Sequence, residues 1–128
     1  MMNQSRRRVR RFFALATAAI MCAAPTADAA DAFRKLGDAE IKAKIAGMEI
    51  TDDIHWTEQY MRDGSFKSWF MSRQLKGKWR AEGGQLCIDD GTPDAGCKEV
   101  WLSGMKVEFR FEAGRVLEGM LQKQQPRG

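Results

Sequence analysis

The chain has 128 residues, 21 of them basic and 17 acidic, and its formal net charge is +4. Five arginines stand within residues 6–11, whereas residues 30–128 carry 16 basic and 16 acidic side chains. The balanced charge of those 99 residues argues against a nucleic-acid-binding surface. Their number is sufficient for one domain with a single hydrophobic core.

The first thirty residues have the three zones of an export signal. After the arginines, residues 12–24 are apolar and uncharged, and Ala27-Asp28-Ala29 matches an A-x-A cleavage site. The apolar run of 13 residues is shorter than the ~20 that a bilayer core requires. We therefore expect residues 1–29 to be a cleavable signal peptide and the mature protein to be periplasmic or secreted, with no stable membrane anchor. An arginine-rich start fits Sec export, and Arg10-Arg11-Phe12-Phe13 leaves twin-arginine export open.

Two cysteines, Cys87 and Cys97, remain after the predicted cleavage. A pair of cysteines in an oxidising compartment predicts a disulfide, and the C-x9-C spacing is unlike the C-x-x-C of thioredoxin-type redox sites.

A short helix is expected at residues 38–46. Asp38 can cap it, Ile41 and Ile45 share one face at i, i+4, and Gly47 provides a stop. A helix of this length must dock on the rest of the domain through its apolar face.

From residue 48 onward the apolar residues alternate with a period of two, which is typical of half-buried strands. Eight short strands are predicted, with turns at residues 62–64, 83–84, 103–104 and 113–114, and with these approximate bounds: 48–51, 55–61, 65–74, 75–82, 85–89, 97–102, 106–111 and 115–122. Short turns imply antiparallel hairpins, so we expect a mainly β meander over residues 30–121 that either closes into a small barrel or curls as an open sheet over the helix. Residues 122–128 are expected to form a frayed polar tail.

The order of these motifs resembles a family. The run Gly77-Lys78-Trp79-Arg80 precedes Gly84-Gln85-Leu86-Cys87, which in turn precedes Cys97-Lys98-Glu99-Val100. This G-x-W … G-x-x-L-C … C order is similar to that of small, uncharacterised exported proteins of alphaproteobacteria. The resemblance implies a lipocalin- or avidin-like β-barrel and names no activity.

The aromatic residues divide into expected core and expected ligand contacts. Trp79, Phe109 and Phe111 alternate with charged residues and are expected to be among the most buried side chains. Indoles in strands can also line a ligand cavity, and the candidate ligand contacts are Trp56, Tyr60, Trp69 and Trp101.

Trp69 has a second interpretation based on strand parity. Phe66, Ser68 and Phe70 share one face of their strand, so Trp69 and Met71 point outward. Either the helix or a partner protein is then expected to cover them.

No catalytic or metal-binding constellation stands out. His55 is the only histidine, and we interpret it as a solvated residue at a strand entrance. We expect no cofactor. Two functions remain: binding of a small apolar or aromatic ligand inside a barrel, or a periplasmic protein-interaction module such as an inhibitor or accessory factor of an envelope enzyme.

The N-terminal pattern predicts cleavage after Ala29, because small residues at Ala27 and Ala29 suit the peptidase. N-terminal sequencing of the exported protein should therefore begin at Ala30. A mature chain that begins at Met1 or at Cys22 would contradict a freely exported domain.

Overall fold

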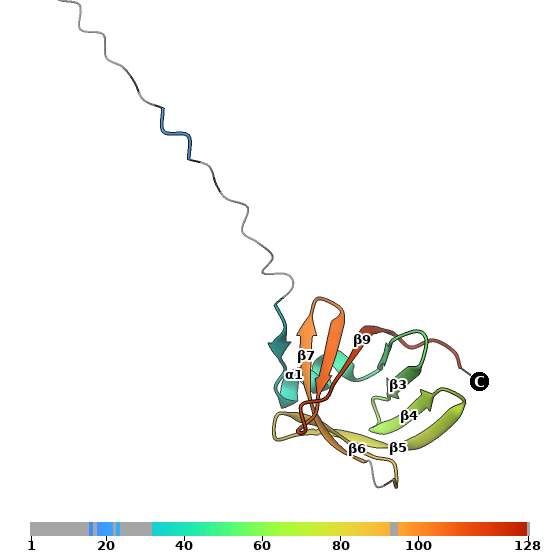
Figure 1. The fold of residues 1–128 in the computed structure, drawn as a ribbon. Coiled ribbons are helices and arrows are strands. Elements are labelled where there is room, and N and C mark those ends of the chain that lie inside the picture. The colour runs from blue at the N-terminus through green and yellow to red at the C-terminus, as the bar shows by residue number, and fades with distance from the viewer. Residues whose placement is uncertain (1–15, 17, 22, 24–31, 93–94, 128) are drawn as a thin grey trace, which may run out of the picture.

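The computed structural model describes residues 16, 18–21, 23, 32–92 and 95–127. The predicted signal peptide therefore lies almost entirely outside the described residues. Nine strands and one helix are formed by the described part of the chain (Figure 1). In chain order they are β1 (Arg34–Lys35), α1 (Asp38–Ile45), β2 (Met48–Thr51), β3 (Trp56–Tyr60), β4 (Ser65–Phe70), β5 (Arg73–Glu82), β6 (Gln85–Asp89), β7 (Gly96–Ser103), β8 (Lys106–Arg110) and β9 (Val116–Lys123).

Strands β2 to β9 form an antiparallel meander in which each strand pairs with the next. The last strand returns to the first, with Met48 opposite Lys123 and Thr51 opposite Met120. This pairing closes the eight strands into a barrel and confirms the first of the two predicted architectures. The two-residue β1 is an extra strand, which pairs with β7 at Trp101 and Leu102, beyond the part of β7 that pairs with β6.

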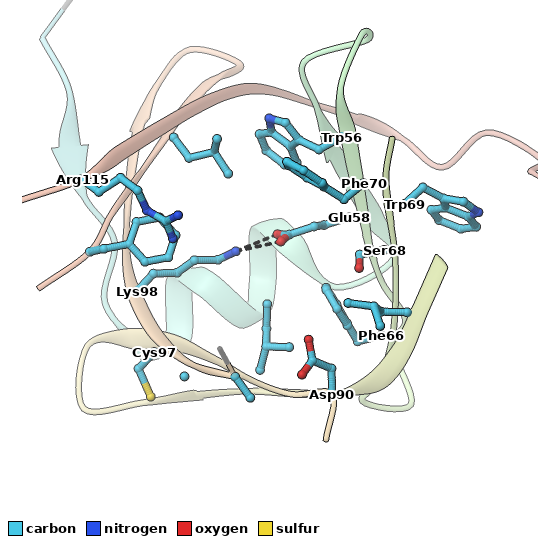
Figure 2. Close-up of a pocket in the computed structure, with 16 residues that line it drawn as sticks. Trp56, Glu58, Phe66, Ser68, Trp69, Phe70, Asp90, Cys97, Lys98 and Arg115 are labelled. Carbon is cyan, nitrogen blue, oxygen red and sulfur yellow. Dashed lines mark hydrogen bonds and ion pairs between the residues drawn. The ribbon is translucent and has the colours of Figure 1, made fainter. Parts of the chain in front are cut away.

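The helix covers one end of the barrel, where Figure 2 shows it lying behind the interior. Ile41 and Ile45 are fully buried there together with Leu36. The predicted capping role of Asp38 is wrong: Gly37 is the N-cap, and the Asp38 carboxylate instead accepts a 2.6 Å hydrogen bond from the Gly84 N–H. Asp38 thus ties the helix to the β5–β6 turn. Within the described residues, no helix is long and apolar enough to cross a membrane.

One turn was missed by the sequence pattern. The strand expected at residues 65–74 ends at Phe70, and a two-residue turn pairs Phe70 with Arg73. Met71 stands in this turn at φ 55°, a conformation usually taken by glycine or asparagine. The turn residues are Met71 and Ser72, without the glycine, asparagine or aspartate that usually marks a two-residue turn, so the sequence pattern predicted no turn at this position.

The core prediction is correct for Phe109 and wrong for Trp79 and Phe111. Phe109 is fully buried, whereas the other two are only partly buried and pack against the core from its margins. Alternation predicts which residues of a strand face the interior. It does not predict how far each of them lies from the open ends of the barrel, where burial is only partial. Trp79 is held by its indole N–H, which donates to the Met61 carbonyl oxygen at 2.8 Å.

The predicted disulfide between Cys87 and Cys97 is confirmed. The two residues face each other across β6 and β7, and their Cα atoms are 4.0 Å apart. The bond therefore joins neighbouring strands at the start of β7.

The C-terminal tail is not frayed over its described part. Glu49 points outward from β2 yet has no exposed surface, because the tail lies over it. Its carboxylate accepts hydrogen bonds from the Gln125 backbone N–H at 2.6 Å, from Arg127 at 2.8 Å, and from Gln59 and Gln122. The tail thus acts as a strap that is held by the buried Glu49 carboxylate and by Gln124, which donates to the Met48 and Tyr60 carbonyl oxygens.

This arrangement predicts an acid-sensitive strap. Burial alone would raise the pKa of Glu49, but the hydrogen bonds, that of Arg127 first, hold it below its ordinary value of 4.5. The stabilisation is therefore present above pH 4.5 and is lost as the pH falls through the lower pKa of the folded protein. Denaturant melts of Glu49→Gln at neutral pH should show a loss of about 1–2 kcal/mol, a modest value because a single layer of chain screens the carboxylate. The difference from wild type should vanish in acid, and a difference that persists at about pH 2 would contradict this assignment.

Candidate functional site

The end of the barrel opposite the helix holds a cavity of ≈ 460 Å³ (Figure 2). Its walls are mainly apolar, and strands on all sides of the barrel contribute to them. The apolar side chains are Trp56, Phe66, Phe70, Leu75, Ile88, Phe111 and Leu117. Polar side chains on the lining are Glu58, Ser68, Asp90, Lys98 and Arg115.

Trp56 lines the wall of the cavity and is 6% exposed. Its indole packs against Phe109 at 6.0 Å between ring centroids. Gly119 on β9 makes this placement possible, because a Cβ atom there would lie 2.9 Å from the indole ring. A close approach of this kind requires glycine.

A buried ion pair crosses the base of the cavity. The Lys98 ammonium from β7 lies 2.7 and 3.1 Å from the two carboxylate oxygens of Glu58 on β3. The Tyr60 hydroxyl donates to the same carboxylate from below. The side chains of Lys98 and Glu58 are 5% and 16% exposed, so water is largely excluded from the pair.

The surroundings of the pair disfavour the charge on Lys98. Burial lowers the pKa of the Lys98 ammonium below its ordinary value of 10.5, and the attraction of Glu58 offsets this only in part. The Lys98 nitrogen also lies 3.8 Å from the centroid of the Phe109 ring. Burial, followed by the Glu58 charge, raises the pKa of the Tyr60 hydroxyl, which therefore stays protonated as a donor.

An apolar rim lies where β3 begins and β4 ends; Phe70 lines the cavity, whereas Ile54 and Met71 line a neighbouring hollow that also includes Trp69. Ile54, Phe70 and Met71 are 80%, 57% and 67% exposed, and the Met71 N–H donates to the His55 carbonyl oxygen, which joins the two loops that carry them. Arg115 stands on another part of the mouth, with its guanidinium 4.1 Å from the centroid of the Phe111 ring. The entrance thus combines exposed apolar side chains with one arginine.

The four residues predicted to contact a ligand lie at different places in the barrel. Trp56 lines the cavity, and Tyr60 is completely buried beneath the ion pair. Trp101 lies on the outer surface of the barrel, where its indole N–H donates to Glu99 at 2.8 Å and Arg110 stacks on its ring at 3.7 Å. It is therefore placed away from the cavity.

Trp69 borders the cavity, but its indole points away from it (Figure 2). The outward direction expected from strand parity is thus observed. Its neighbour on the outside is the strap: the Arg127 guanidinium lies 5.9 Å from the ring centroid. The helix packs against β2, β5 and β6 instead, so it does not serve as the cover for this tryptophan.

The two charged residues at the base of the cavity were missed by the sequence reading. A signal existed, because Glu58 has the parity of Trp56 and Tyr60, and Lys98 has the parity of Val100. Charged side chains usually face water, and for that reason neither residue was expected in the interior.

Comparison of this chain with protein families, with curated proteins and with solved structures finds no significant match.

The ion pair predicts a large asymmetry between single and double substitutions. Lys98→Met leaves the Glu58 carboxylate buried without its partner and should cost about 3–5 kcal/mol. Adding Glu58→Gln removes the stranded charge and should restore most of that stability. Urea melts of the two single variants and the double variant measure the coupling, and a loss in the double variant equal to the sum of the two single losses would show that the pair is not energetically coupled.

Proposed function

We propose that this chain is an exported binding protein that holds a small apolar or aromatic ligand in the open end of its barrel. The observation that carries the proposal is the cavity of ≈ 460 Å³, which lies within the range of about 300–1,000 Å³ typical of small-molecule sites. Aromatic walls with a few convergent polar groups are the composition expected of such a site.

The polar groups narrow the class of ligand. A flat or alicyclic body suits the walls near Trp56 and Phe66, and a polar substituent at the inner end would meet the Lys98–Glu58 pair. At the outer end, the Arg115 guanidinium favours an anionic or polar group. The site therefore suits an amphipathic molecule better than a pure hydrocarbon.

Export of the protein is supported by two features of different kinds. The N-terminal residues have the pattern of a signal peptide. The Cys87–Cys97 disulfide is of a kind that persists in oxidising compartments.

A protein-interaction module is the second candidate, and the apolar rim of Ile54, Phe70 and Met71 favours it. The two functions differ in where binding occurs. A small ligand contacts Trp56 inside the barrel, whereas a protein partner contacts the rim and leaves the interior unchanged.

The test uses the anionic aromatic dye anilinonaphthalene sulfonate and a matched pair of tryptophan variants. Wild-type protein should bind the dye saturably at one site, with enhanced dye fluorescence. Trp56→Leu removes a wall of the cavity and should weaken binding about tenfold, as the loss of a central aromatic contact does. Trp101→Leu makes the same change on the outer surface and should leave the affinity unchanged.

Circular dichroism of both variants checks that the barrel is intact. Equal affinities in wild type, Trp56→Leu and Trp101→Leu would place the dye outside the barrel and contradict ligand binding in the cavity.

A further inference from the structure

Lys98 combines two properties that seldom occur together: its amine is buried, and it lines a cavity large enough for a ligand. The side chain is 5% exposed, yet it belongs to the lining of the ≈ 460 Å³ space. Figure 2 shows the Lys98 side chain reaching toward Glu58 in the middle of the barrel. A ligand in the cavity would therefore lie against this amine.

Aromatic rings and the Glu58 carboxylate surround the Lys98 amine and exclude water from it. Phe109 lies against the nitrogen at 3.8 Å, and Phe111 lies farther along at 5.9 Å. An ammonium in apolar surroundings loses hydration, which lowers the pKa of Lys98 as described above. Lysines activated in this way are the ones that react with carbonyl compounds.

Glu58 stands where a proton carrier is needed. Its carboxylate oxygens are 2.7 and 3.1 Å from the Lys98 nitrogen, so a proton can pass directly between the two groups. The Tyr60 hydroxyl hydrogen-bonds to the same carboxylate and orients it, which makes Tyr60 a positioning residue. Lys98, Glu58 and Tyr60 therefore form a relay of amine, carboxylate and phenol at the base of the cavity.

We propose that Lys98 captures aldehyde or ketone ligands in the cavity as an imine, an inference that rests on the binding function proposed above. The ammonium first gives one proton to Glu58, and the free amine then adds to the carbonyl carbon, after which one proton passes from the added nitrogen to the carbonyl oxygen. The resulting hydroxyl group leaves as water with the proton held by Glu58, and a carbon–nitrogen double bond forms. The overall change converts the ammonium and the carbonyl compound into a protonated imine and one water, so no oxidant or reductant is consumed. The protonated imine keeps the ion pair with Glu58.

The other lysines serve as internal controls for this chemistry. Lys42, Lys44, Lys76, Lys78, Lys106 and Lys123 are exposed and lie outside the cavity. Because they are solvated and lie away from the cavity, they should react slowly with carbonyl compounds.

The experiment uses naphthaldehyde with cyanoborohydride, which reduces an imine to a stable secondary amine. After incubation of the mature, disulfide-bonded protein at neutral pH, proteolysis and mass spectrometry map the modified lysines. Modification of Lys98 should exceed that of each exposed lysine by at least about tenfold, as expected for an activated amine. Uniform low modification of all lysines would overturn the proposal.

Naphthylmethanol separates the failure of imine formation from the failure of binding, because it has the same ring system without a carbonyl. A complex with naphthylmethanol in native mass spectrometry, together with no preference for Lys98 in the aldehyde reaction, overturns the imine and leaves the binding function standing. The absence of both overturns the two proposals together.

The double variant Lys98→Met/Glu58→Gln provides the matched control. It should lose the preferential aldehyde adduct at this position, and circular dichroism checks that its barrel is intact. If this variant does not fold, the lysine mapping of wild type decides the question without it.

Discussion

Pairing of β9 with β2 is the constraint on which the rest of this structure depends. It gives every barrel strand two neighbours and leaves an interior that must be filled or hydrated. An eight-stranded barrel is just wide enough for side chains to fill it. Here the helix contributes Ile41 and Ile45 at one end only. The opposite end consequently remains open as a cavity, and its depth is set by where the helix-side core stops.

The Lys98–Glu58 pair lies at the boundary between the filled and the open halves of the barrel. Removing two charges from water costs more than their attraction commonly returns, and an apolar pair of the same size would serve stability as well. Tyr60 adds a third polar group to this position. A requirement to recognise or react with something in the cavity accounts for the pair better than a requirement for stability does.

Period-two patterning allowed the antiparallel barrel and the disulfide to be predicted, because hydrophobic alternation, tight turns and cysteine pairing act locally along the chain. The features that the sequence pattern did not predict depend on tertiary contacts. Met71 adopts a turn conformation without a turn-forming residue type, and Asp38 bonds to a backbone group 46 positions away rather than to its own helix. Lys98 faces inward because strand geometry leaves it no other direction once Val100 is in the core. The outward position of Trp101 follows from the same parity, but its cover by Arg110 depends on the β7–β8 register.

Arginine side chains partly cover aromatic rings on the barrel surface. The uncovered apolar rim differs from the rest of the surface in this respect. Arg110 stacks on Trp101, and Arg127 lies near Trp69, so these outward rings are not left bare. Among the described barrel residues, the three most exposed large apolar side chains are instead Ile54, Met71 and Phe70, which gather beside the mouth. Trp56 lines both the cavity and the hollow beside this edge, so the two share one wall residue. In the proposed binding function, an apolar ligand would meet this edge beside Trp56.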